Sequence, residues 1–148
     1  MGPVRYFTIA EVVAIHAEIM RRLGEAPEPL RDAGLLESAI MRPQMAAWYE
    51  DADLIRQGTL LAVGISQAQA FVDGNKRTAF ATLDAFFYIN GWELTGDPID
   101  LARQLEALAD HSRNESAIEA FAEWLRARAA PRTSEEKHET SRTSRTRT

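Results

Sequence analysis

The stretch Gln69-Ala70-Phe71-Val72-Asp73-Gly74-Asn75-Lys76-Arg77-Thr78-Ala79-Phe80 is the part of this chain that decides its organisation. Residues 73–77 bring together an acid, a glycine, an amide and two cations, and apolar residues at helical spacing follow them. A turn that opens a helix presents unpaired backbone N–H groups, and the helix dipole draws anions to that end. The glycine favours the turn, and the two cations add positive charge. The pattern therefore indicates a phosphate-binding helix N-terminus.

Asp73 is the residue that does not suit a bare phosphate site, since its carboxylate would repel the anion. A divalent cation between the two removes the conflict, and oxygen ligands are those that Mg²⁺ prefers. The alternative is a solvated helix start with Asp73 or Asn75 as N-cap and two exposed bases. Cations in a first helical turn oppose the dipole and cost a few tenths of a kcal/mol or so unless an anion is present. We therefore favour a phosphate and magnesium site.

The segment 71–79 resembles the signature of the Fic/Doc superfamily, in the form found in the death-on-curing (Doc) toxins, which have Asn-Lys-Arg where Fic enzymes have Asn-Gly-Arg. The likeness covers roughly residues 4–125. It includes Phe7-Thr8 with His16, the run 31–39, Arg42-Pro43-Gln44 and the segment 83–91.

The resemblance implies transfer of the ATP γ-phosphate, with Mg²⁺, to a hydroxyl of a translation elongation factor Tu-like protein, and control by an antitoxin protein. It assigns the metal to Asp73, the phosphates to Gly74, Asn75, Lys76 and Arg77, and the charge developed during transfer to Lys76 and Arg77. Fic-type members transfer AMP instead. We expect phosphoryl transfer, because Lys76 fills the space that a glycine would leave for the nucleotide.

Gln69 marks one departure from the family. The signature begins with a histidine that the resemblance makes the general base, and glutamine cannot accept a proton near neutral pH. Both a natural degenerate member and an inactivating substitution fit this residue. A catalytically inactive nucleotide- or partner-binding module, or a plain helical interaction domain, therefore stays open as an alternative.

Composition places the chain among single-domain globular proteins. It has 148 residues, 45% of them hydrophobic, no cysteine, and a net charge of −5. From Pro131 onward there are five Lys/Arg and three Asp/Glu, so the rest of the chain carries 12 basic and 19 acidic residues. An acidic body argues against direct nucleic-acid binding. With no long apolar run and no signal-peptide pattern, we expect no membrane span and a cytoplasmic location.

Periodicity predicts an all-α bundle of six or seven helices in residues 1–130, followed by a polar, disordered tail over 131–148. Thr8 and Glu11 form a capping box for a helix ending near Leu23. Two short helices are expected, one over 32–41 with Asp32 as its N-cap and one from Pro43, with the target-binding edge near 41–49. A buried helix over 52–68 leads to the motif, and the helix over 76–90 should be the central one.

The remaining elements are a short strand at 92–94, a helix opened by Asp97-Pro98 and a last helix capped by Asn114. His16 lies beside the apolar stripe of the first helix. A lone histidine there is typical of packing, and we assign it no catalytic role.

Overall fold

The computed structural model describes residues 2–109 and 114–132, and in these parts it contains six helices and two short strands. In chain order they are α1 (Ile9–Arg22), α2 (Ala33–Glu50), α3 (Leu54–Ala68), α4 (Asn75–Ile89), β1 (Trp92–Leu94), α5 (Pro98–Ala109), α6 (Glu115–Arg126) and β2 (Ala129–Pro131). The predicted all-α bundle is confirmed. No described helix is both long and apolar enough to cross a bilayer.

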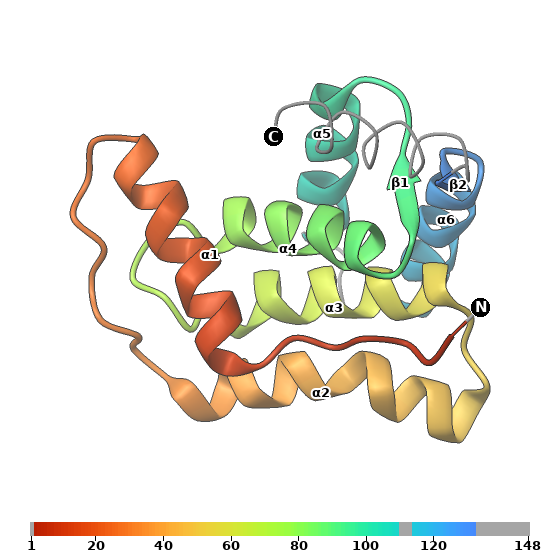
Figure 1. The fold of residues 1–148 in the computed structure, drawn as a ribbon, viewed down its shortest axis with the longest axis horizontal. Coiled ribbons are helices and arrows are strands. Elements are labelled where there is room, and N and C mark those ends of the chain that lie inside the picture. The colour runs from red at the N-terminus through yellow and green to blue at the C-terminus, as the bar shows by residue number, and fades with distance from the viewer. Residues whose placement is uncertain (1, 110–113, 133–148) are drawn as a thin grey trace, which may run out of the picture.

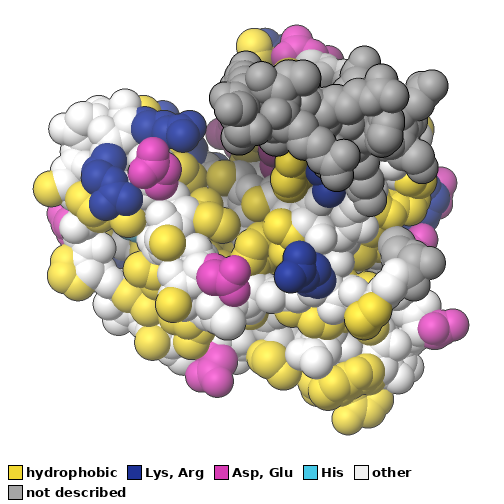
Figure 2. All heavy atoms as spheres, in the orientation of Figure 1, with side chains coloured by type: hydrophobic (Ala, Val, Ile, Leu, Met, Phe, Trp, Pro, Cys, Tyr) yellow, Lys and Arg dark blue, Asp and Glu magenta, His cyan; other side chains and the backbone are white. Residues whose placement is uncertain are grey.

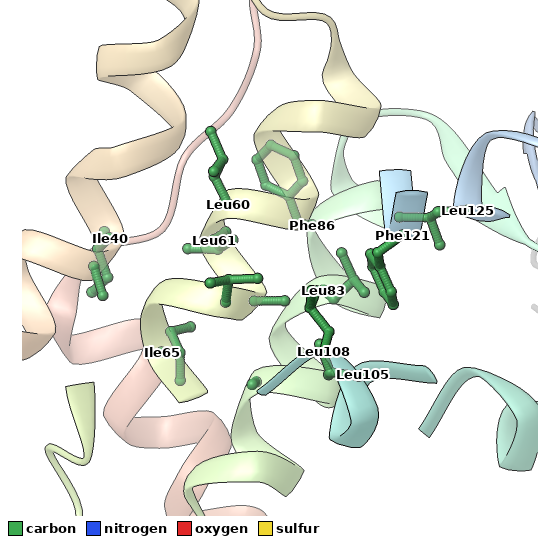
Figure 3. Close-up of a cluster of buried hydrophobic side chains, with 14 of the residues drawn as sticks. Ile40, Leu60, Leu61, Ile65, Leu83, Phe86, Leu105, Leu108, Phe121 and Leu125 are labelled. Carbon is green, nitrogen blue, oxygen red and sulfur yellow. The ribbon is translucent and has the colours of Figure 1, made fainter. Parts of the chain in front are cut away.

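The helices α2, α3 and α4 lie in successive layers, and α1 crosses the end of this stack at which α3 leads into α4 (Figure 1). The helices α5 and α6 also pack on α3, and they contact each other. Apolar side chains from α2 to α6 meet in one core, which includes Ile40, Leu61, Leu83, Leu105 and Phe121 (Figure 3). This arrangement leaves the turn between α3 and α4 under α1.

The centre of the bundle is shared by two helices. In α3 every residue from 54 to 66 is buried except Arg56, whereas α4 exposes Lys76, Arg77, Asp84 and Tyr88. The prediction that the helix after the motif is the central one therefore needs correction, because α3 is the more enclosed of the two.

The first helix begins as predicted. The Thr8 side chain accepts the Glu11 N–H at 3.2 Å, and the Glu11 carboxylate accepts the Thr8 N–H at 3.0 Å. Asp32 and Asn114 likewise cap α2 and α6. Each cap is a contact within three residues of sequence, which is why sequence could locate it.

One prediction about the helices is wrong: α2 is a single helix that runs through Pro43, not two short ones. A proline inside a helix leaves the carbonyl four residues earlier, here that of Ala39, without its usual donor. The chain gains close packing instead, since a Cβ on Gly64 of α3 would lie 3.1 Å from the Ala39 Cβ and 3.3 Å from its carbonyl oxygen. Pro43 itself is buried, and the burial of its apolar ring offsets part of the cost of the missing hydrogen bond.

A second strand is a feature that the sequence analysis missed. The strand β1 was predicted, and it pairs antiparallel with β2, so that Trp92 lies opposite Pro131 and Leu94 opposite Ala129. The pairing includes Pro131, the first residue of the predicted tail. The rest of that tail, apart from Arg132, lies outside the described residues.

Candidate functional site

The motif loop, residues 69–74, joins the end of α3 to the start of α4. Gln69 ends α3 in the left-handed conformation, with φ 49° and ψ 38°. The backbone N–H groups of Arg31 and Asp32 both donate to the Ala70 carbonyl, at 2.7 and 3.2 Å. The Arg31 guanidinium also donates to the Gln69 carbonyl. The segment before α2 therefore holds the start of this loop, and Arg31 bonds to the loop rather than to Asp32.

The side chain of Asn75 closes the loop from inside. It is buried, accepts the Phe71 N–H at 3.0 Å and donates to the Phe71 carbonyl at 2.9 Å. Because both of its polar atoms are engaged in this way, the side chain braces the loop. Only the backbone N–H of Asn75 remains to face an anion at the helix start.

The N-terminus of α4 is open. Its N-cap is Gly74, with φ 81°, and no side chain in the described part of the chain caps the helix. The alternative of a solvated helix start is therefore wrong about its N-cap, which is neither Asp73 nor Asn75, although its two bases are exposed. The N–H groups of the first turn point out beside the exposed cations Lys76 and Arg77, and such an end attracts phosphate.

Asp73 lies next to this open end, and its exposed carboxylate accepts the Gly74 N–H at 2.8 Å. In the described residues no three His, Asp or Glu side chains converge as a metal-ligand set. One carboxylate beside a phosphate-binding turn nevertheless fits Mg²⁺, because that ion is usually held by one or two carboxylates, substrate phosphates and water. Asp73 is the residue that would hold it, and Mg²⁺ would neutralise phosphate charge there.

Gln69 is exposed, and its side chain stays close to the loop. Its amide nitrogen donates to the Ser66 carbonyl at 2.8 Å, and its amide oxygen lies 3.4 Å from the Asn75 amide nitrogen. The amide oxygen has a second lone pair, with which it can accept a hydrogen bond from a neighbouring hydroxyl and orient it. It supplies no proton acceptor near neutral pH.

A groove of about 540 Å³ begins at the two motif cations and runs between α1, α4 and α5. Lys76, Arg77 and Glu106 give it a charged end, and Ile19, Phe80 and Leu105 give it an apolar floor. The Lys76 ammonium lies 3.7 Å from the Glu106 carboxylate, with both side chains more than half exposed. Figure 2 shows hydrophobic side chains exposed beside the part of the surface formed by α1.

The predicted target-binding edge, residues 41–49, extends along α2 away from the motif loop. Trp48 and Tyr49 are exposed, at 65% and 79%, but they lie at the end of α2 close to the start of α3. The 15 residues of α3 separate that end from Gln69, a distance of about 22 Å at 1.5 Å per residue. The residues that contact the motif loop are instead those just before α2, Arg31 and Asp32.

The structure also brings His16 to the loop. Sequence reasoning placed it among packing residues, and it is indeed buried, with 3% of its surface exposed. Its partners are Phe71, Asp73 and Gly74, more than 50 positions along the chain. Nothing in local sequence links these residues, and only the crossing of α1 over the loop does.

Comparison with known proteins agrees with this geometry. Residues 6–87, which contain the whole motif, match the model of the Fic/DOC family. The chain is 40% identical over 79 residues to "Toxin Doc" of Mycolicibacterium smegmatis (strain ATCC 700084 / mc(2)155), a match that covers 51% of this chain and 61% of that protein. It is 30% identical over 96 residues to "Protein kinase doc" of Escherichia phage P1, covering 64% of this chain and 75% of that one. The match to the first relative thus spans less than two thirds of that relative's length.

The family match covers more than half of the chain, and the observed helical fold and the open, cationic start of α4 accord with it. The chain belongs to the Fic/DOC family.

Proposed function

We propose that this chain is a Doc-type toxin whose site is built to transfer the γ-phosphate of ATP to a hydroxyl of another protein. The observation that carries the proposal is the open N-terminus of α4, which has Gly74 as N-cap and the exposed residues Asp73, Lys76 and Arg77 around it. A relative at 30% identity is named a protein kinase, which favours phosphoryl transfer over AMP transfer. The target that the family resemblance implies is an elongation factor Tu-like protein.

In this mechanism the protein chiefly supplies position and positive charge. The first-turn N–H groups, Lys76 and Arg77 bind phosphate oxygens, and the arginine can do so with two parallel hydrogen bonds. Asp73 holds Mg²⁺. A bond forms between the acceptor oxygen and the γ-phosphorus while the bond to the bridging oxygen breaks, ADP leaves, and the hydroxyl proton passes to solvent.

Gln69 leaves the site without a general base. It can orient the acceptor hydroxyl, but it cannot take its proton. A missing general base costs on the order of 10²–10⁴ in rate. We therefore propose that this chain binds ATP with Mg²⁺ and transfers phosphate slowly, and that Gln69→His raises the rate by about that factor.

The groove supports the second part of the proposal, an antitoxin partner. An antitoxin segment that folds on binding needs an exposed apolar groove, and the groove over Ile19, Phe80 and Leu105 provides one. Its charged end includes Lys76 and Arg77, so an acidic residue on the partner would reach the same cations that phosphate needs.

Calorimetry of ATP binding with and without Mg²⁺ tests the site, on the native chain, on Asp73→Ala and on Asp100→Ala as a control. Asp100 is an exposed acid in the first turn of α5. We expect Mg²⁺ to strengthen ATP binding, and we expect Asp73→Ala to abolish that gain in affinity while the control keeps it. No binding by the native chain would overturn the nucleotide site and leave the interaction-domain alternative.

A transfer assay with Gln69→His then identifies the group moved. Label from γ-³²P-ATP on purified elongation factor Tu supports phosphoryl transfer, and label from α-³²P-ATP supports the AMP alternative. Binding without transfer of either label, even in Gln69→His, would favour the inactive nucleotide-binding module.

A further inference from the structure

The imidazole of His16 and the backbone of the motif loop are in direct contact. The His16 Nε2 atom lies 2.8 Å from the Asp73 carbonyl oxygen. Its ring stacks on that of Phe71, with centroids 3.9 Å apart and planes 10° from parallel. Asp73 is exposed at its carboxylate, so one residue faces the protein with its carbonyl and solvent with its side chain.

This contact determines which nitrogen of the His16 ring carries a proton. A carbonyl oxygen only accepts, so Nε2 must carry the proton and donate it. Because a trans peptide is planar, the Gly74 N–H points away from the Asp73 carbonyl. There it donates to the Asp73 carboxylate at 2.8 Å. The peptide between Asp73 and Gly74 is therefore held at its oxygen by His16 and at its N–H by the carboxylate of Asp73.

Gly74 completes the contact with α1. A Cβ at this position would lie 3.4 Å from His16 Nε2 and 3.0 Å from the Met20 sulfur. Its backbone is therefore seated directly against two residues one helical turn apart on α1. Both of these residues are buried on α1.

We propose that His16 is a positioning residue for the metal carboxylate. By holding the Asp73–Gly74 peptide in one orientation, it sets the direction in which the Asp73 carboxylate faces a divalent cation at the start of α4. It does not touch the nucleotide or the reacting atoms. The proposal rests on the proposed Mg²⁺ site, and it adds that the metal affinity depends on a residue 57 positions away.

The variant that isolates the hydrogen bond is His16→Phe, which keeps a ring to stack on Phe71 and loses the donor. His16→Gln is its counterpart, since the amide can still donate to the Asp73 carbonyl. We measure ATP binding by calorimetry over a range of Mg²⁺ concentrations, and again in EDTA. Groups that orient a metal ligand typically contribute 10–100-fold in affinity, so His16→Phe should raise the half-saturating Mg²⁺ concentration at least about tenfold.

Binding of ATP in EDTA should stay unchanged in His16→Phe, and His16→Gln should bring back most of the Mg²⁺ affinity. If the Mg²⁺ requirement of His16→Phe equals that of the native chain, the proposal is wrong. It is equally wrong if ATP binding in EDTA falls in parallel, because the histidine would then only support the fold.

Hydrogen exchange of the Gly74 amide, followed by NMR without nucleotide, separates this proposal from the proposed function. In His16→Phe the Asp73–Gly74 peptide is no longer held, so the Gly74 amide should exchange its hydrogen about tenfold faster. In His16→Gln the exchange rate should be close to that of the native chain. If the native chain binds no ATP at any Mg²⁺ concentration, the proposed function and the metal role fail together. Native exchange in His16→Phe would show that His16 does not hold the peptide, whatever the nucleotide result.

Discussion

Arg56 on α3 and Glu119 on α6 form an ion pair across the bundle, with Nη1 and Oε2 2.7 Å apart. The same guanidinium pairs with Glu50 at 2.8 Å and Glu115 at 2.7 Å. Only 16% of the Arg56 side chain is exposed, and the hydrogen bond that it donates to Glu50 is the main cause of its raised pKa. One cation thus neutralises carboxylates from the end of α2 and from α6.

Replacing Arg56 by methionine should lower the free energy of unfolding by about 1.5–3 kcal/mol, the range for hydrogen bonds to charged groups. Three carboxylates would be left facing one another. Chemical denaturation at neutral pH measures the loss. Arg22→Met is the matched control: Arg22 pairs with Glu18 at 3.1 Å, but 79% of it is exposed, and we expect no measurable change. Equal losses in the two variants would mean that the bridging of helices by Arg56 contributes nothing.

Asn75→Ala should be among the most destabilising polar changes in the motif. It removes both hydrogen bonds to Phe71, whose buried N–H and carbonyl would be left unpaired, at a cost of about 2–4 kcal/mol. Asn75→Asp keeps an acceptor for the Phe71 N–H but places a buried carboxylate oxygen beside the Phe71 carbonyl oxygen, so it should lose at least as much. Thermal unfolding orders the three proteins. An Asn75→Ala protein as stable as the native chain would show that the loop holds without this brace.

Gly74→Ala tests how closely α1 is packed on the motif. A left-handed backbone with φ 81° costs a non-glycine residue about 1–2 kcal/mol. The control is Gly91→Ala, which has the same φ of 81° but nothing within 4 Å of the added carbon. We expect Gly74→Ala to lose more stability than this control, because its Cβ meets the Met20 sulfur. Equal losses would leave backbone strain as the whole effect and remove the packing argument.

Asp84 on α4 gives the protein a pH dependence. Desolvation raises the pKa of its carboxyl group above the usual 3.8, so folding favours the protonated form. This contribution to stability is complete below pH 3.8 and disappears as the pH rises through the raised pKa. Asp84→Asn should therefore be more stable than the native chain at pH 7, by less than about 1 kcal/mol because the side chain is partly solvated.

Unfolding measured from pH 3 to pH 7 checks this prediction. The stability gain of Asp84→Asn should shrink to nothing at the acid end of the range. A gain that is constant with pH would exclude the carboxyl group as its cause.

The sequence by itself determined the parts of this protein that depend on neighbouring residues. The Thr8–Glu11 capping box, the Asp32 and Asn114 caps and the apolar spacing of the helices all act over one or two turns, and the structure confirms them. The motif 73–77 likewise indicated its own place at the start of a helix. Chemistry carried by consecutive residues can be recognised without a fold.

Only the tertiary structure decided the relationships between distant segments. Pro43 lies buried within one continuous helix, one turn after Ala39, which packs closely against Gly64 of α3. The strand β2 exists because β1 offers it a partner. The side chain of Asn75, assigned to the phosphates from the sequence, braces the loop by bonding to Phe71, and His16 contacts Asp73 across 57 residues. These contacts depend on which helix faces get buried together, which is a property of the whole chain and not of any local pattern.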